Sequence, residues 1–331
     1  MTVRKQMRVT LRRLAAVTVT LATLGVPTAT YLYVKERVQL GEQQPAPSPP
    51  ALSPAAQARF RAASTSGRSF VVLGYHDLVD SVAATTPSGG RRVSVSATAF
   101  AAHLRMLRLA GYRSVSAAEV AEVVNGRGAL PPHAVLLTFD GARWRDWSYA
   151  DPILKAYGFQ ATVFVDPATV LTQRGTTLSW RVLRRMTGSG RWSVGVAGTK
   201  DTVEIGPGRA ASALLGRRWL TDRNRPETAA AYGGRIQASI DRQRRTVVAH
   251  GLAEPRLFSY PFQPRYPLPP DQLTSLTRVV TGSFDAATLT LAGDTTADEA
   301  WLKKRILPRL EIYGSTTDEM LFNRIQNLAT S

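Results

Sequence analysis

The chain opens with a long apolar segment and then alternates short apolar runs with amphipathic stretches. Leu14–Val34 contains 21 residues without a charge, and a helix of that length spans about 30 Å, the thickness of a membrane core. Five basic residues precede this segment and two follow it, an asymmetry that favours a cytoplasmic N-terminus. The pattern predicts a cytoplasmic tail at 1–13 and a single-pass signal-anchor helix at 14–34. The bulk of the chain would then be extracytoplasmic.

A cleaved signal peptide is the alternative for this segment, and the protein would then be secreted. The next stretch, 35–67, contains the proline-rich run QQPAPSPPALSP at Gln43–Pro54. Such a composition favours an extended, semi-rigid linker. We therefore predict a linker at 35–67 and a folded domain at 68–331.

Within 68–331, β-like runs alternate with helical patterns. Strands are predicted at Phe70–His76, Ala134–Asp140, Ala161–Val165, Trp192–Val196, Arg256–Phe262 and Ile306–Tyr313. Helices are predicted at Ala97–Ala110, Trp147–Tyr157, Trp180–Met186, Gly234–His250 and Thr316–Leu328. Repeated βα units of this kind indicate a parallel α/β sheet or barrel. The carboxyl ends of barrel strands usually carry the chemistry, and here these ends hold His76, Asp140, Ala197 and Tyr260.

Composition narrows the chemistry. The chain has no cysteine, which excludes disulfides, thiolate metal sites and cysteine nucleophiles. Its net charge of +18 would suit nucleic acid, but no nucleic-acid-binding motif accompanies the scattered basic residues. We expect no nucleic-acid partner.

Five segments, in order, resemble a known family. They are Gly74-Tyr75-His76-Asp77, Gly111-Tyr112, LLTFD at Leu136–Asp140, YADPILKAYGFQATVFV at Tyr149–Val165 and RLFSYPF at Arg256–Phe262. Together they resemble the polysaccharide deacetylase family (the NodB-like domain of carbohydrate esterases), and most of all the branch that deacetylates poly-N-acetylglucosamine. The resemblance covers about Arg68 to Gly314. It implies a distorted (β/α)7 barrel that removes acetyl groups with zinc or another divalent metal.

The resemblance also assigns roles to residues. Asp140 stands at the position of the catalytic base, Arg256 at the residue that orients the base, and the backbone N–H of Tyr260 at the oxyanion. The three metal-ligand positions are occupied by Gly141, Ala197 and Asp201. The family's late histidine acid has no counterpart, since the last histidine is His250. Residues expected to line the substrate groove are Tyr75, His76, Trp144 and Asp201.

The missing ligands bear on activity. No two of the four histidines are four residues apart, so no His-x-x-x-His ligand pair exists. A metal lowers the pKa of bound water from about 15.7 to about 7, worth about 12 kcal/mol towards hydroxide. A carboxylate base alone contributes about 3–5 kcal/mol. We expect no cofactor, and deacetylase activity that is absent or very weak.

The sequence therefore favours a membrane-anchored pseudoenzyme whose partner is an N-acetylated cell-envelope glycan or a polysaccharide-assembly protein. One alternative is an active glycan N-deacetylase with a nonstandard metal site that includes Asp140 and Asp201. Another is a structural component of a polysaccharide synthesis or export complex. The ligand positions count against the active enzyme, but they do not separate the other two.

Overall fold

The structure is a computed structural model that describes residues 43–63, 69–80, 93–172, 177–199, 201–261, 270–291, 294–295 and 297–330. Residues 43–331 form one compact unit. The predicted cytoplasmic tail and anchor helix at 1–34 lie outside the described residues. Among the described residues, no helix is both long and apolar enough to cross a membrane.

Seven parallel strands of the described chain close into a ring. Its order is β1 (Ser69–Tyr75), β14 (Ile306–Glu311), β13 (Ala286–Thr290), β12 (Leu257–Ser259), β7 (Trp192–Ala197), β6 (Ala161–Val165) and β5 (His133–Asp140). The pairing of β1 with β5, from Ser69↔His133 to Tyr75↔Phe139, closes it. A short strand, β4 (Arg113–Ser114), pairs with the start of β5. The predicted (β/α)7 barrel is confirmed.

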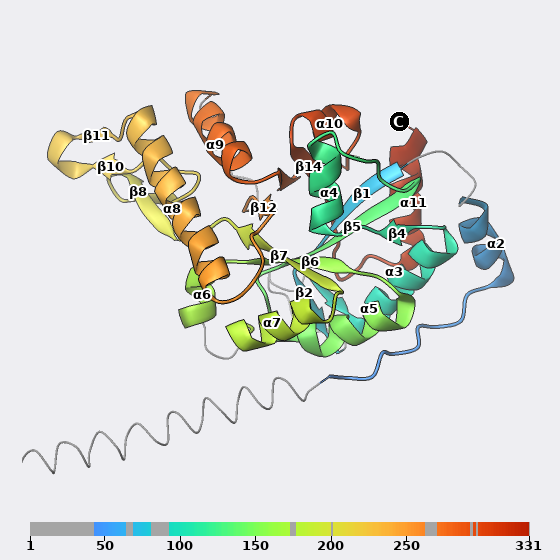
Figure 1. The fold of residues 1–331 in the computed structure, drawn as a ribbon. Helices are drawn as coiled ribbons and strands as arrows, with labels where there is room; N and C mark the ends of the chain where they lie inside the picture. The colour runs from blue at the N-terminus through green and yellow to red at the C-terminus, as the bar shows by residue number, and fades with distance from the viewer. Residues whose placement is uncertain are drawn as a thin grey trace, which may run out of the picture. The chain divides into compact units, whose positions relative to one another are not determined.

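Helices cover the outside of this ring (Figure 1). In chain order they are α2 (Pro54–Ala63), α3 (Ala97–Leu109), α4 (Ala117–Val124), the π-helix η2 (Asp146–Ala150), α5 (Asp151–Tyr157), α6 (Pro167–Thr172), α7 (Trp180–Gly188), α8 (Ala229–Ala249), α9 (Pro270–Ser283), α10 (Glu299–Lys303) and α11 (Asp318–Thr330). Several begin at capping side chains; at the start of α7, Ser179 accepts a hydrogen bond from the Val182 N–H. Gly158 ends α5 in the left-handed conformation, which glycine adopts without steric cost.

In the described part of the chain, three short strand pairs lie outside the main sheet. Strands β2 (Asp77–Val79) and β3 (Ser94–Ser96) pair in parallel. Between β7 and α8, two hairpins form from β8 (Thr202–Gly206) with β9 (Arg209–Ser212), and from β10 (Trp219–Leu220) with β11 (Arg225–Pro226), with the 3₁₀ turn η3 (Thr221–Arg223) between the last two. The sequence pattern predicts none of these elements, because they are too short to show a period.

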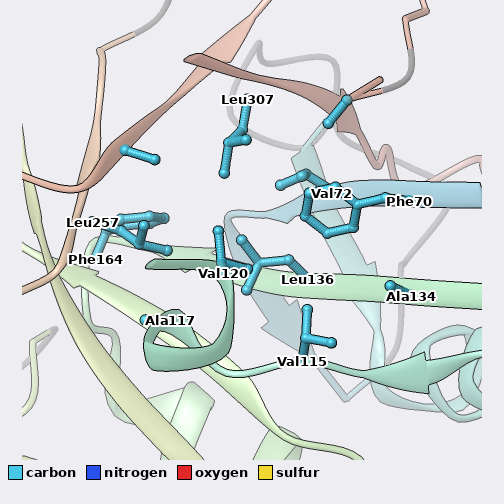
Figure 2. Close-up of a cluster of buried hydrophobic side chains, with 12 residues drawn as sticks. Phe70, Val72, Val115, Ala117, Val120, Ala134, Leu136, Phe164, Leu257 and Leu307 are labelled. Carbon is cyan, nitrogen blue, oxygen red and sulfur yellow. The ribbon is translucent and has the colours of Figure 1, made fainter. Parts of the chain in front are cut away.

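The apolar core inside the ring follows from strand alternation, which points every second side chain inward. Twelve buried residues cluster there (Figure 2): Phe70, Val72, Val115, Ala117, Val120, Ala134, Leu136, Phe164, Leu257, Ala286, Ala297 and Leu307. Most come from the first half of their strands. Val115, Ala117 and Val120 come from α4 and the residues before it, and Ala297 precedes α10, so these segments cover the amino end of the barrel.

Part of the predicted linker belongs to the folded unit. Helix α2 packs on the barrel domain through Phe60, which is fully buried and lies 4.8 Å, between ring centroids, from Phe322. Upstream, the Gln43 amide donates to the Asp151 carboxylate at 2.7 Å. The proline-rich segment therefore lies against the domain over its described residues, and the compact unit begins at Gln43 rather than at residue 68.

Candidate functional site

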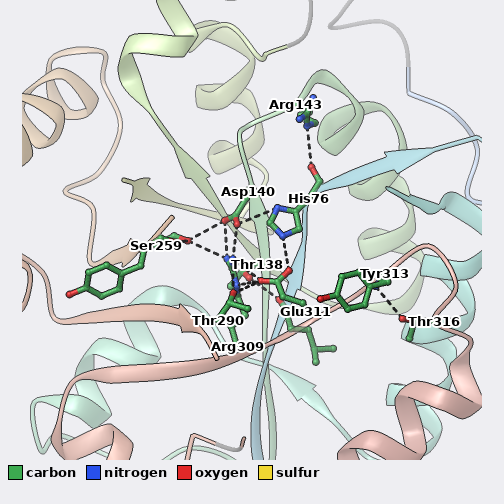
Figure 3. A network of polar contacts seen from close by, with 12 residues as sticks. His76, Thr138, Asp140, Arg143, Ser259, Thr290, Arg309, Glu311, Tyr313 and Thr316 are labelled. Carbon is green, nitrogen blue, oxygen red and sulfur yellow. Dashed lines mark hydrogen bonds and ion pairs between the residues drawn. The ribbon is translucent and has the colours of Figure 1, made fainter. Parts of the chain in front are cut away.

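The same alternation that points apolar side chains inward at the amino end points polar ones inward at the carboxyl end. On β14 the inward positions read Leu307, Arg309 and Glu311, and on β5 they read Leu136, Thr138 and Asp140. These polar side chains meet in one network (Figure 3). We name the group Asp140, His76, Ser259, Thr290, Arg309 and Glu311 the Asp140 network.

An arginine holds the candidate base. The Arg309 guanidinium donates to both Asp140 oxygens, from Nη1 to Oδ1 at 2.9 Å and from Nη2 to Oδ2 at 2.8 Å. A Cβ at Gly74 would lie 2.8 Å from the Arg309 Cδ, so a glycine at 74 makes room for this side chain. Burial opposes the charge of Arg309, but the carboxylates of Asp140 and Glu311 outweigh it and raise the pKa of Arg309. Asp140 is thus held as an oriented carboxylate.

A second carboxylate holds the histidine. Glu311 Oε2 lies 2.6 Å from His76 Nε2, and His76 Nδ1 lies 3.5 Å from Asp140 Oδ2. Burial raises the pKa of Glu311, but the interactions with Arg309 and His76 outweigh this effect and lower the pKa to about 2. His76 is therefore fixed between two carboxylates. The sequence predicts no histidine acid, but the closure of β1 against β5 brings His76 to Asp140.

Exposure shows which part of the network a ligand can meet. The side chains of Arg309 and Glu311 are 2% and 3% exposed, whereas that of Asp140 is 20% exposed. Ser259 completes the inner contacts, with its Oγ 3.3 Å from Asp140 Oδ1 and 3.2 Å from Arg309 Nη1. A ligand at the carboxyl end of the barrel would meet Asp140, while Arg309 and Glu311 would act from beneath it.

The predicted role of Arg256 is wrong. Arg256 directly precedes β12 and so lies at the amino end of the barrel, opposite Asp140. Its guanidinium pairs with Asp285 at 2.5 Å and with Glu122 at 3.5 Å. Arg309, from a different strand, takes the place beside Asp140 that the resemblance gave to Arg256.

Two tyrosines also differ from their predicted roles. The Tyr260 N–H donates to the Thr288 carbonyl at 3.0 Å, so strand pairing occupies the group expected at the oxyanion. Tyr75 is fully buried and points away from His76, because neighbouring residues of a strand face opposite sides. Its ring stacks on Phe139 and its hydroxyl lies 3.2 Å from His103 Nδ1. Tyr75 is therefore a packing residue between the barrel and α3, and no groove residue.

The loop after Asp140 is held in an unusual conformation. Gly141 has φ 97° and Ala142 has φ 47°, both in the region that side chains with a Cβ rarely adopt. The Leu178 N–H donates to the Ala142 carbonyl, and the Arg143 N–H donates to the Asp146 carboxylate. Trp144 follows, half-buried, with its ring centroid 6.2 Å from that of Tyr149. Of the predicted groove residues, His76 and Trp144 accompany Asp140 at this end of the barrel.

The residues at the expected ligand positions do not fit a zinc site. Gly141 offers no side chain, and Ala197 ends β7 with a methyl group. Asp201 is exposed and lines a separate pocket of about 560 Å³ with Thr199, Arg218 and Arg235. Within the described residues, no group of three or more His, Cys, Asp or Glu side chains could hold a metal ion. The two oxygens of Asp140 are already bound to Arg309.

Arg309 and Glu311 are not among the predicted site residues, although the sequence carries a signal for them. Both lie two residues apart in the predicted strand Ile306–Tyr313, where charges on one face of an apolar run are unusual. What the pattern could not supply was the neighbour. Only ring closure places β14 beside β1, with Leu73↔Leu310 and Gly74↔Glu311 in register.

With this geometry in place, known proteins give a consistent picture. Residues 127–266 match the family model described as "Polysaccharide deacetylase". The poly-β-1,6-N-acetyl-D-glucosamine N-deacetylase of Escherichia coli (strain K12) is 27% identical over 209 residues, which cover 58% of this chain and 30% of that protein. The chain thus spans less than a third of the length of this relative.

Solved structures share the fold. A de-N-acetylase from Aggregatibacter actinomycetemcomitans superposes with a TM-score of 0.65 at 21% identity, covering 77% of this chain and 99% of that one. The BpsB deacetylase domain from Bordetella bronchiseptica gives 0.56 at 20% identity, covering 75% and 97%. At these identities the likeness establishes the barrel and its connectivity.

Proposed function

We propose that the polysaccharide deacetylase domain of this chain binds an N-acetylated cell-envelope polysaccharide and is catalytically degenerate. The match to the family model and the similarity to the relatives confirm the resemblance to polysaccharide deacetylases seen in the sequence. The observation that carries the proposal is a division within one site. Asp140 and His76 are held in place, whereas Gly141 and Ala197 leave the adjacent ligand positions without a donor atom.

The energetics support degeneracy. Hydroxide at neutral pH needs a Lewis acid worth about 12 kcal/mol of pKa change. A carboxylate base acting on free water supplies about 3–5 kcal/mol. Arg309 adds positive charge, but it is 2% exposed and turned towards Asp140 and Glu311. The groups present therefore fall several kcal/mol short of ordinary deacetylase catalysis.

The site still suits a neutral sugar. Small-molecule sites combine aromatic side chains with a few convergent polar groups. Trp144 and Asp140 lie at the same, carboxyl end of the barrel. Export of the domain by the segment 14–34 is part of the proposal and rests on the sequence alone. It would put the site where cell-envelope glycan is found.

Direct binding tests this proposal. The full chain should bind fluorescent β-1,6-linked N-acetylglucosamine oligomers and leave their acetyl groups intact. Trp144→Ala should weaken binding at least tenfold. Trp301→Ala is the matched control, because Trp301 lies on α10 and contacts Lys304, at the end of the barrel where β14 begins. Absence of binding by the wild type, or equal losses in the two variants, would count against the assigned groove.

A restored ligand set tests the degeneracy. The triple variant Gly141→Asp, Ala197→His, Asp201→His should bind one zinc ion if these positions correspond to the family's ligands. A Cβ at Gly141 would lie in open space, but φ there is 97°, so the aspartate would carry backbone strain, although Asp tolerates this region better than most residues. A folded triple variant without zinc would refute the placement of Ala197 and Asp201.

A further inference from the structure

A concave site lies at the opposite end of the barrel from Asp140. It is bordered by the ends of α3 and α5, by β4, and by the loops that precede β6 and β7, and it has a volume of about 840 Å³. We name it the basal pocket and define it by Arg108, Tyr112, Arg113, Lys155, Tyr157 and Arg191. Strand β5 runs between the two sites over eight residues, which separates them by roughly 23 Å.

The basal pocket is strongly cationic. Arg108, Arg113 and Lys155 are exposed, and no carboxylate of the described residues forms an ion pair with them. Arg191 is the exception, since it binds Asp151 through Nε at 3.0 Å and Nη2 at 2.9 Å. Three full positive charges therefore border one cavity without an internal counter-ion.

The single acidic residue on the wall does not offset them. Glu119 caps its own helix: its Oε2 accepts from the Ser116 N–H at 2.7 Å and from the Ser116 hydroxyl at 2.7 Å. The same oxygen accepts from the Gln160 amide at 3.2 Å. Glu119 is thus bound into the wall and turned towards these donors.

The walls of the basal pocket are fixed by hydrogen bonds. The Gln160 N–H donates to the Ser114 hydroxyl at 2.8 Å, which ties β4 to the loop before β6. Tyr112 and Phe159, which are 5% and 4% exposed, supply a packed apolar floor. Folding therefore already holds the elements that carry these cations in place, and such preorganisation favours binding.

Helix ends explain only part of this arrangement. Arg108 and Lys155 occupy the last turns of α3 and α5, where the helix dipole favours cations. Arg113 lies on β4 and has no such partner. A shared anion would satisfy all three charges at once.

We propose that the basal pocket binds a soluble oligomer of phosphodiester-linked units. Guanidinium groups bind phosphate with two parallel hydrogen bonds, and a lysine adds a point charge. The cavity is far larger than one phosphate ion, so it suits a ligand with two or more phosphates and the group that joins them. Its concave form favours such an oligomer over a flat membrane surface. The two ends of the barrel would then bind chemically different ligands, one neutral and one anionic.

Calorimetric titration of the full chain with tripolyphosphate tests the site. We expect saturable binding at 0.15 M salt and a loss of at least tenfold in affinity for Arg108→Gln, Arg113→Gln, Lys155→Gln. The matched control is Arg209→Gln, Arg225→Gln, Arg245→Gln, which removes the same charge from exposed positions outside the pocket. The control should change affinity less than twofold. The single variant Arg113→Gln should weaken binding about threefold and guards against misfolding of the triple variant.

Two outcomes would overturn the proposal. Equal losses in the two triple variants would mean that overall charge, and not the basal pocket, attracts the anion. Stronger binding to vesicles of phosphatidylglycerol than to a glycerol phosphate oligomer, abolished by the same pocket variant, would assign the pocket to a membrane surface instead.

Discussion

The two sides of the barrel's carboxyl end differ in what they hold. On the side of β1, β5 and β14, four charged or ionisable side chains pair with one another: His76, Asp140, Arg309 and Glu311. On the side of β6, β7 and β12, small residues prevail. A Cβ at Gly195 would lie 2.5 Å from the Phe164 ring, and one at Gly198 would lie 2.7 Å from Pro261. On the small side, close packing leaves no room for larger side chains. On the charged side, the space is occupied by the paired side chains themselves.

The contrast separates the base position from the expected ligand positions. Buried ions persist in a fold only when each has a partner, because a lone charge costs several kcal/mol. The charged side meets that condition within itself and needs no metal to be stable. Gly141, directly after β5, and Ala197, at the end of β7 on the small side, offer no side-chain donor atoms. The ionic network around Asp140 therefore does not depend on ligands at these two positions.

Removing the central cation should have the strongest effect. Arg309→Met leaves Asp140 and Glu311 without their shared partner, and we expect a loss of about 3–5 kcal/mol in unfolding free energy. Arg256→Met, which breaks a pair on a side chain 37% exposed, should cost about 1 kcal/mol or less. Urea unfolding of both variants measures the contrast. Similar losses would erase the distinction between Arg309 and Arg256.

The second effect is a pH dependence of the charged side. The folded state lowers the pKa of Glu311 from 4.5 to about 2, so its ionised form stabilises the fold at pH above about 4.5. That stability, about 3 kcal/mol, is lost as the pH falls towards 2. Glu311→Gln should be less stable than the wild type at pH 7, with the gap closing in acid. A gap that is constant from pH 7 to pH 2 would show that the Glu311 charge is not what stabilises the network.

A weaker effect belongs to the loop that follows β5. Gly141→Ala introduces a Cβ at φ 97°, and we expect a cost of about 1–2 kcal/mol. Gly234→Ala, at an exposed position within α8, should instead stabilise by about 0.5–1 kcal/mol. Thermal unfolding distinguishes the two signs. Stabilisation by both would mean that the loop after Asp140 relaxes freely.

The weakest effect lies at the boundary of the two sides. Ser259 contacts Asp140 and Arg309 through long hydrogen bonds of 3.3 Å and 3.2 Å. Ser259→Ala should therefore cost about 1 kcal/mol or less. A loss above about 2 kcal/mol, measured by urea unfolding, would make Ser259 an integral part of the ionic network.

The fold could be predicted from the sequence where a hydrophobic pattern runs over a whole helix or strand. The strand expected at Ala161–Val165 is found with the same bounds, and α7 contains the whole of the helix expected at Trp180–Met186. Helix α2 was missed because the proline-rich composition around it favours extended chain, while packing of Phe60 decides its conformation. Strand β13 was missed because Ala286–Thr290 contains small and polar residues, and its burial between β12 and β14 has no local signal.

The candidate site was only half predictable. Asp140 follows from its motif, and the small residues at 141 and 197 can be read directly. The prediction for Arg256 failed because Arg256 lies four positions before Tyr260, and at about 3.3 Å per residue a strand carries the two to opposite ends of the barrel. Arg309 and Glu311 depend on ring closure, a contact between the two ends of the domain that no local pattern encodes.

Metal content and acetate release, measured together, decide whether the domain is catalytically degenerate. Bound zinc, nickel and cobalt should be determined on the purified full chain, alongside acetate release from β-1,6-linked N-acetylglucosamine oligomers. We expect less than about 0.1 metal ion per chain and acetate release no faster than for the Asp140→Asn variant. Stoichiometric metal, with turnover that Asp140→Asn abolishes, would contradict degeneracy and make the protein an active deacetylase.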